Sequence, residues 1–154
     1  MIVGKALYEG VLLKCRFARF FLNKIVDKSN QVDDLKAIDK QLYDNLMMVK
    51  YYEDSPVEDL GLTMTVAQDT FGVNQEIELL RDGANVPVTN ENRIMYIILY
   101  AKWLLSDRMR IQVGCFLRGM RSVFSEDYFS IFFPDEIDKL ISGGKSEIDI
   151  DNLR

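Results

Sequence analysis

The chain has 154 residues, of which 48% are hydrophobic and 28% charged, and its formal net charge at pH 7 is -5. This composition is ordinary for a soluble globular domain with a sizeable core. No basic stripe is present, which argues against a nucleic-acid partner. No apolar run approaches the roughly 20 residues of a membrane span, which argues against a membrane protein.

Histidine is absent, which removes the commonest general base near neutral pH and the commonest metal ligand. The two cysteines, Cys15 and Cys115, are far apart and match no metal-binding spacing. Both lie in apolar helical contexts, so we expect buried, unreactive thiols. The N-terminus has no signal-peptide pattern, and we expect an intracellular protein, cytoplasmic or nuclear. We expect no metal and no cofactor.

Two helices are expected first, over residues 2–14 and 17–27. Gly4 and Gly10 lower the helix propensity of the first by roughly 1 kcal/mol each relative to alanine. We expect both glycines to allow close helix packing. The second helix is rich in phenylalanine and stops in the polar stretch 27–31.

A further helix is expected over about 40–51, after a short helical turn that opens at Asp33. Asp39 is a suitable N-cap for this helix, and Pro56 follows its end. Leu42, Leu46 and Val49 recur at helical spacing on one face. Tyr43, Met47 and Tyr51 repeat on an adjacent side, so the apolar surface is wider than one core stripe requires.

A small β element is expected next. Residues 60–66 and 75–80 alternate loosely between apolar and polar and predict two strands. Residues 81–85 have the composition of a turn, and 86–88 predict a short edge strand around Pro87.

The following helix, from Thr89 or Asn90 to about Leu105, carries two apolar stripes where a folded helix needs one. One stripe consists of Ile94, Ile97, Ile98, Ala101 and Leu105 and is expected to face a core. The other consists of Tyr96, Tyr100 and Trp103. A helix with two such stripes is either fully buried or lies between its own core and a partner.

Three helices are expected in the last third, over 107–124, 125–132 and 134–143. Pro134 at the start of the last and Gly143 at its end are strong boundary signals. Residues 148–151 alternate as a strand does. The order of elements predicts an α+β fold that is mainly α-helical with a small antiparallel β element.

Several segments, in this order and spacing, resemble the N-terminal lobe (N-lobe) of HECT-type ubiquitin ligases. They are 4–13 (GKALYEGVLL), 20–21 (FF), 33–35 (DDL), 39–46 (DKQLYDNL), 57–60 (VEDL), 71–72 (FG), 78–93 (ELLRDGANVPVTNENR), 116–120 (FLRGM) and 133–143 (FPDEIDKLISG). The stretch up to residue 62 looks most like the branch of the ligase called UBE-three-C and its fungal relatives.

This resemblance implies that the N-lobe recruits a ubiquitin-conjugating enzyme (E2) and that ubiquitin then passes to a cysteine in a C-terminal lobe. Neither Cys15 nor Cys115 has the Thr–Cys–Phe context of that cysteine. The chain is therefore expected to be an internal part of a HECT N-lobe, inactive alone. Residues 32–106 would form the small E2-binding subdomain, and 1–31 with 107–154 would form parts of the large one.

The resemblance also implies which residues bind the E2, namely Leu42, Leu46, Leu60, Leu62, Tyr96 and Tyr100. These side chains would line an apolar groove that accepts a side chain from an E2 loop. A ubiquitin-binding exosite of the family uses an aromatic residue before a glycine, which here is Phe71. The expected partners are an E2, ubiquitin and the remainder of the HECT domain.

Other interpretations of the same residues stay open at this point. The leucines and tyrosines, and Trp103 with them, could be ordinary core, and Phe71 a loop aromatic held against its own domain. The chain could then be a non-catalytic helical scaffold or a self-association domain without E2 binding. An enzyme acting by itself is disfavoured, because no histidine and no suitable cysteine is present. The acids Glu53, Asp54, Glu58 and Asp59 are either a solvated loop or a surface that steers a basic partner.

Overall fold

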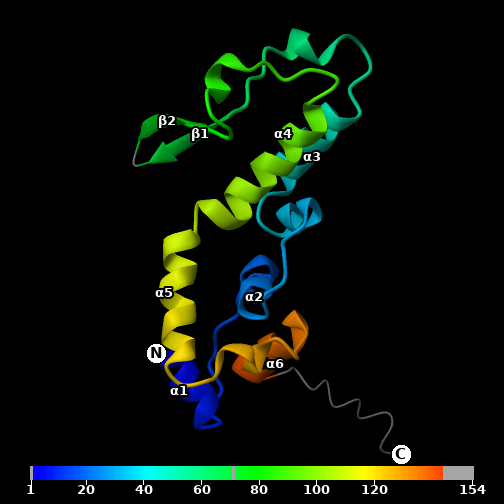
Figure 1. Ribbon diagram of the computed structural model, residues 1–154. Coiled ribbons are helices and arrows are strands. Elements are labelled where there is room, and N and C mark those ends of the chain that lie inside the picture. The colour runs from blue at the N-terminus through cyan, green and yellow to red at the C-terminus, as the bar shows by residue number, and fades with distance from the viewer. Residues whose placement is uncertain (1, 71, 144–154) are drawn as a thin grey trace, which may run out of the picture. The chain divides into compact units, whose positions relative to one another are not determined.

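The computed structural model describes residues 2–70 and 72–143 (Figure 1). Its contacts divide the chain into two compact units. The central unit is Asn30–Arg110, and the terminal unit joins Met1–Ser29 to Ile111–Arg154. The predicted strand over 148–151 lies outside the described residues. The fold is α+β with helix predominating, as the sequence predicts.

The terminal unit contains four α-helices and one 3₁₀ turn among its described residues. They are α1 (Ile2–Tyr8), α2 (Arg19–Ile25), α5 (Arg110–Arg121), the 3₁₀ turn Glu126–Phe129 and α6 (Pro134–Ser142). Both α1 and α2 pack against α6. The chain between α1 and α2 is tied to α6 by a hydrogen bond of 2.8 Å from the Leu13 amide to the Ile141 carbonyl.

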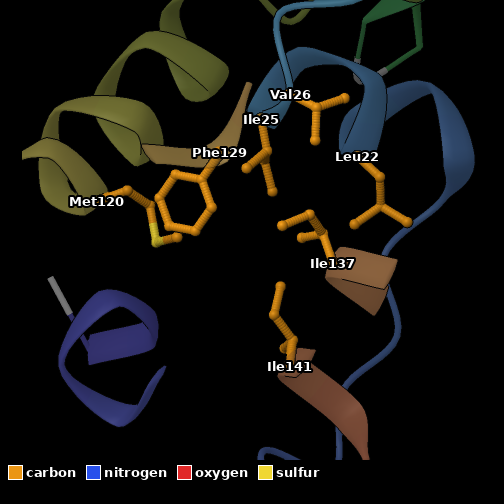
Figure 2. Close-up of a cluster of buried hydrophobic side chains, with 7 residues drawn as sticks. All are labelled: Leu22, Ile25, Val26, Met120, Phe129, Ile137 and Ile141. Atoms are coloured by element: carbon orange, nitrogen blue, oxygen red, sulfur yellow. The ribbon is translucent and has the colours of Figure 1, made fainter. Parts of the chain in front are cut away.

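The core of this unit is a cluster of seven buried side chains, shown in Figure 2. They are Leu22, Ile25, Val26, Met120, Phe129, Ile137 and Ile141. Phenylalanines pack around them, with Phe21 and Phe116 edge to face at 4.9 Å between ring centroids. The aromatic residues that the sequence places in two separate helices therefore serve one core.

The helix ends follow the residues that start and stop helices. Pro134 begins α6 and Gly143, with φ of +72°, follows its last residue, as predicted. The first helix is shorter than the predicted 2–14, because Gly10 adopts φ of +70° and turns the chain out of the helix. Gly4 does mark close packing, since a Cβ there would lie 3.4 Å from the Met120 Cα.

The expectation of two buried thiols is wrong for one cysteine. Cys15 is half-buried and packs against the core cluster, whereas Cys115 is exposed on α5. The inward face of α5 runs through Val113 and Met120, and Cys115 and Ile111 lie off it.

The central unit is built on two packed helices, α3 (Lys40–Lys50) and α4 (Arg93–Lys102), and a 3₁₀ segment, Val32–Ala37, packs against both. Between α3 and α4 come the 3₁₀ turn Val57–Leu60, strands β1 (Thr65–Thr70) and β2 (Val73–Glu78), and the short turn Gly83–Asn85. A π-helical turn, Trp103–Asp107, follows α4, and the Asn30 side chain donates to the Leu105 carbonyl within it at 3.1 Å.

Both predicted strands exist, but they are displaced from the predicted ranges. β1 and β2 pair antiparallel from Thr65 opposite Glu78 to Thr70 opposite Val73. Gly72 supplies the positive φ of the connection, +82°, and its amide donates to the Asp69 carboxylate at 2.7 Å. The predicted third strand over 86–88 is only an isolated bridge between Thr63 and Pro87.

Gly83 is required where the chain turns after β2. A Cβ on Gly83 would lie 2.4 Å from the carbonyl oxygen of Met64. That carbonyl also accepts a hydrogen bond of 2.9 Å from the Leu79 amide, so it is held in place on the other side. The turn therefore tolerates no side chain without moving backbone.

We predict that Gly83→Ala lowers the free energy of unfolding by about 2 kcal/mol, because overpacking against backbone has a cost of this order. Gly114→Ala is the matched control. A Cβ at Gly114, inside α5, meets nothing within 4 Å. It is expected to raise the free energy of unfolding by about 0.5–1 kcal/mol through helix propensity. Urea unfolding followed by circular dichroism measures both, and equal effects of the two substitutions would contradict the prediction.

Candidate functional site

An open apolar hollow of about 400 Å³ lies in the central unit, between α3, α4 and the segment around Gly61. Its lining residues are Leu42, Asn45, Leu46, Met48, Val49, Leu60, Leu62, Tyr96 and Tyr100. We call this hollow the groove. All six residues that the family resemblance implies for E2 binding line it, although they come from three separate segments of the chain.

Helix α3 forms one wall of the groove because its cap fixes its start. The Asp39 carboxylate accepts from the Leu42 amide at 2.8 Å, as an N-cap side chain does. Asn45, Leu46 and Val49 follow Leu42 by three, four and seven residues, and all of them face the groove. Leu46 and Val49 are buried and form its floor, while Leu42 is half-buried at its edge.

Helix α4 forms the opposite wall. Thr89 and Asn92 exchange side-chain hydrogen bonds with each other's amides, at 2.8 and 3.3 Å, and so fix the turn that precedes the helix. The Arg93 guanidinium donates to the Tyr52 carbonyl at 2.8 Å and ties this end to the chain after α3. The predicted start at Thr89 is thus a capped turn, and α4 proper begins at Arg93.

The two tyrosines of α4 differ in exposure. Tyr96 is 6% exposed, whereas Tyr100 is half-buried, and their rings meet edge to face at 5.9 Å between centroids. Trp103 contacts the Tyr100 ring at 6.3 Å but does not line the groove. Tyr96 therefore belongs to the floor with Leu46, and Tyr100 presents its ring at the edge.

The third segment is held in place by backbone hydrogen bonds. Gly61, with φ of +63°, ends the 3₁₀ turn that carries Leu60 and directs the chain toward Leu62. The Leu62 carbonyl accepts from the Val88 amide at 2.8 Å. Leu60 and Leu62 thus lie just before β1 and not within a strand, which corrects the predicted strand over 60–66.

The expectation that the isoleucine stripe of α4 faces a core is right for three of its five residues and wrong for two. Ile97, Ala101 and Leu105 are buried, as expected. Ile94 and Ile98, expected in the core, are exposed, Ile98 to 53%. They border a smaller hollow of about 240 Å³ together with Tyr43 and Met47 of α3. The reason is that α3 and the 3₁₀ segment Val32–Ala37 cover only part of α4, so two of its isoleucines meet solvent.

Three groove residues, Asn45, Met48 and Val49, are absent from the set that the sequence implied. Helical spacing already places Val49 on the face of Leu42 and Leu46, and Asn45, three residues after Leu42, could have been found in the same way. Met48 is 58% exposed and had no such signal. Phe71, which the resemblance implies for a ubiquitin-binding exosite, lies outside the described residues.

Burial raises the pKa of Tyr96 to about 12, and the neighbouring Tyr100 adds to this shift. An unfolded tyrosine titrates near pH 10. The stability that follows from the neutral Tyr96 hydroxyl is therefore fully present below about pH 10 and is lost as the pH rises through about 12.

The free energy of unfolding of the wild type is expected to fall when the pH is raised from about 8 to about 11.5. We predict that this fall is about 2 kcal/mol smaller in Tyr96→Phe, because phenylalanine cannot ionise. The measurement is urea unfolding at both pH values. Tyr51→Phe removes an exposed hydroxyl from the same unit and should follow the wild type. An equal alkaline loss in Tyr96→Phe and the wild type would contradict the burial of this side chain.

Within residues 2–70 and 72–143, no cluster of His, Cys, Asp or Glu has the arrangement of a metal site. In the same ranges no helix is both long and apolar enough to cross a membrane. What the central unit offers is thus an apolar, open groove with two tyrosine rings, a geometry suited to holding a side chain of another protein.

Comparison with known proteins agrees with the sequence resemblance. A family model described as HECT-domain (ubiquitin-transferase) matches residues 1–154. The chain is 36% identical over its whole length to a Schizosaccharomyces pombe protein named "Probable E3 ubiquitin protein ligase". It is 35% identical over 99% of its length to Ubiquitin-protein ligase E3B of Homo sapiens, and 37% identical over 99% to E3 ubiquitin-protein ligase UPL6 of Arabidopsis thaliana.

In each case the chain spans 15% of the length of the relative. The assignment to the UBE-three-C branch stays a prediction. The match over the whole chain, together with relatives above one third identity, shows that this chain belongs to the HECT-domain (ubiquitin-transferase) family.

Proposed function

We propose that this chain is the E2-binding portion of a HECT-type E3 ubiquitin ligase, and that the groove receives an apolar side chain from a loop of the E2. One observation carries the proposal: the six residues that the family resemblance names come together around one open apolar hollow. In this scheme the chain holds the E2 while ubiquitin passes to a cysteine in a C-terminal lobe.

The exposure of the groove residues fits a surface that is completed by a partner. Leu42, Leu62 and Tyr100 are half-buried, so a partner side chain would remove the rest of their apolar surface from water. Full burial of such a side chain contributes about 1.5–3 kcal/mol. Association costs several kcal/mol, so the expected dissociation constant is on the order of micromolar. Weak binding suits a carrier that must leave once its ubiquitin has been transferred.

The experiment is a titration of the chain with a panel of ubiquitin-conjugating enzymes by biolayer interferometry. Leu62→Ala and Tyr100→Ala test the groove, because these side chains reach its edge and are not part of the buried floor. Each is expected to weaken binding about tenfold, which corresponds to about 1.4 kcal/mol. Ile98→Ala is the matched control, since it removes an exposed side chain from α4 outside the groove.

The proposal requires that at least one E2 binds saturably. Both groove substitutions must weaken this binding, and the control must leave its dissociation constant within about twofold of the wild-type value. Circular dichroism establishes that each variant is folded. A folded wild-type chain that binds no E2 in the panel would contradict the proposal. Equal weakening by Ile98→Ala would contradict the placement of the site in the groove.

The alternative role, a scaffold that associates with itself, is favoured by exposed isoleucines on the terminal unit. Ile2, Ile111 and Ile131 are all largely solvent-exposed in the chain. Analytical ultracentrifugation over a range of concentrations tests it, since self-association without E2 binding would support this role over the first. In either role we propose an intracellular protein, cytoplasmic or nuclear.

A further inference from the structure

The segment that carries Leu60 and Leu62 has a marked charge asymmetry. Residues 51–80 contain seven acidic residues and no lysine or arginine. Glu58 and Asp59 precede Leu60 within the 3₁₀ turn and are exposed. One edge of the groove is therefore formed by a segment that bears negative charge alone.

A second hollow lies on another face of α3 and meets the groove at Met48. It is lined by Asp44, Met47, Met48, Tyr51, Tyr52, Glu53 and Asp54, and Met48 lines the groove as well. Met48 and Tyr51 expose large apolar surface there, the latter to 67%. Apolar side chains and exposed carboxylates thus lie together in a hollow that shares Met48 with the groove.

Among the carboxylates of this surface, only that of Asp44 is in an ion pair found within the described part of the chain. Lys40 pairs with Asp44 at 2.6 Å, and the Arg93 guanidinium donates to the Tyr52 carbonyl. Lys50 lies over the Tyr51 ring at 5.0 Å from its centroid. None of the ion pairs found within the described part of the chain uses one of the four acids Glu53, Asp54, Glu58 and Asp59.

We infer that the partner side chain in the groove is flanked, on the partner, by lysine or arginine residues that form ion pairs with these four acids. The four acids are here called the acidic rim. The inference rests on the proposed function and adds the chemistry of the partner. Long basic side chains fit this surface in two ways. Their aliphatic stems would cover Met48 and Tyr51, and their charged ends would reach the carboxylates. The contact of Lys50 with the Tyr51 ring shows that this ring already accommodates a cation.

Several separate cations fit the rim better than one bound metal ion does. Within the described ranges, no group of acids has the arrangement that holds a metal. Exposed carboxylates spread along a surface act mainly on the rate of association, because they steer an oppositely charged partner toward the groove. The expected signature is therefore an association rate constant, kon, that falls steeply with salt.

The test measures kon for the 154-residue chain and an E2 that binds it, at about 0.01 M and about 0.15 M salt, where the Debye length is about 30 and about 8 Å. Wild-type kon is expected to fall about tenfold between these conditions. Glu53→Gln with Asp54→Asn, and Glu58→Gln with Asp59→Asn, are each expected to lower kon about threefold at the lower salt, and to flatten its salt dependence.

The matched control is Glu76→Gln with Glu78→Gln on β2, which removes the same charge from the same acidic segment outside both hollows. Glutamine can still accept the bonds that these residues receive from Thr65 and Ala84. A kon that is insensitive to salt, or a control that slows association as much as the rim variants do, would overturn the inference while leaving E2 binding intact. A wild-type chain that binds no E2 would overturn the proposed function, and this inference with it.

Discussion

Replacing Ile137 by alanine is expected to lower the free energy of unfolding by about 3–4 kcal/mol, the largest effect on stability that we predict. Ile137 has no exposed surface and lies among the seven side chains of the terminal core (Figure 2). It projects from the first half of α6, where Pro134 and the acids that follow fix the helix start. Because neighbours from α2 and α5 are held by their own helices, the cavity left by the substitution should collapse only partly.

Denaturant unfolding measures this effect, with Ile131→Ala as the control. Ile131 is the same residue type in the same unit, but it is 76% exposed. Its substitution should change the free energy of unfolding by less than about 0.5 kcal/mol. A loss below about 1 kcal/mol in Ile137→Ala would show that the core cluster is packed less tightly than the structure describes.

The second large effect is expected for Leu46→Ala, at about 2–4 kcal/mol. Leu46 is buried at the floor of the groove and lies between α3 and the tyrosines of α4. Since α3 and α4 pack against each other, the cavity would open inside the central unit. A loss of E2 binding in this variant would then result from loosening of the fold. Substitutions of Leu62 and Tyr100 therefore test direct contact with the E2 better.

Native-state hydrogen exchange distinguishes the two causes. In Leu46→Ala, amide protection should fall throughout residues 30–110, because the central unit has its own contacts. Met48→Ala, on the same helix but exposed, should leave protection unchanged. Unchanged protection in Leu46→Ala would contradict the placement of this side chain in the floor.

The elements that the sequence predicted well are those whose ends are fixed by local chemistry. Asp39 caps α3, and Pro134 and Gly143 bound α6, so the predicted and observed ends agree within one or two residues. These signals act through hydrogen bonds and φ values of neighbouring residues, and they need no knowledge of the rest of the fold.

The strands and the helix junction depended on information that is not local. The hairpin register is set by the connection at Gly72, whereas alternation alone placed the first strand about five residues before β1 and the second two residues after β2. Likewise, the helix from α4 continues only as a π-helical turn after Lys102, where the Arg108 amide bonds the Trp103 carbonyl at 2.9 Å. No residue type between Trp103 and Asp107 predicts a π-helical turn.

The groove was predictable only in part. The family resemblance named six of its residues, and periodicity placed Tyr96 and Tyr100 on a stripe of their own. Periodicity could not decide which stripe of α4 is covered, because that depends on what packs against the helix. Ile98 is consequently exposed, although periodicity placed it on the core stripe, and Tyr96 of the other stripe is buried.

The most direct test of the account is a titration of the chain, labelled at its leucine, isoleucine and methionine methyl groups, with an E2 followed by NMR. We predict that the largest chemical-shift changes occur at Leu42, Leu62 and Met48, which line the groove. The methyl resonances of Ile94 and Ile98, which line the smaller hollow, should not shift. Shifts centred on those two isoleucines, with the groove leucines unmoved, would contradict it.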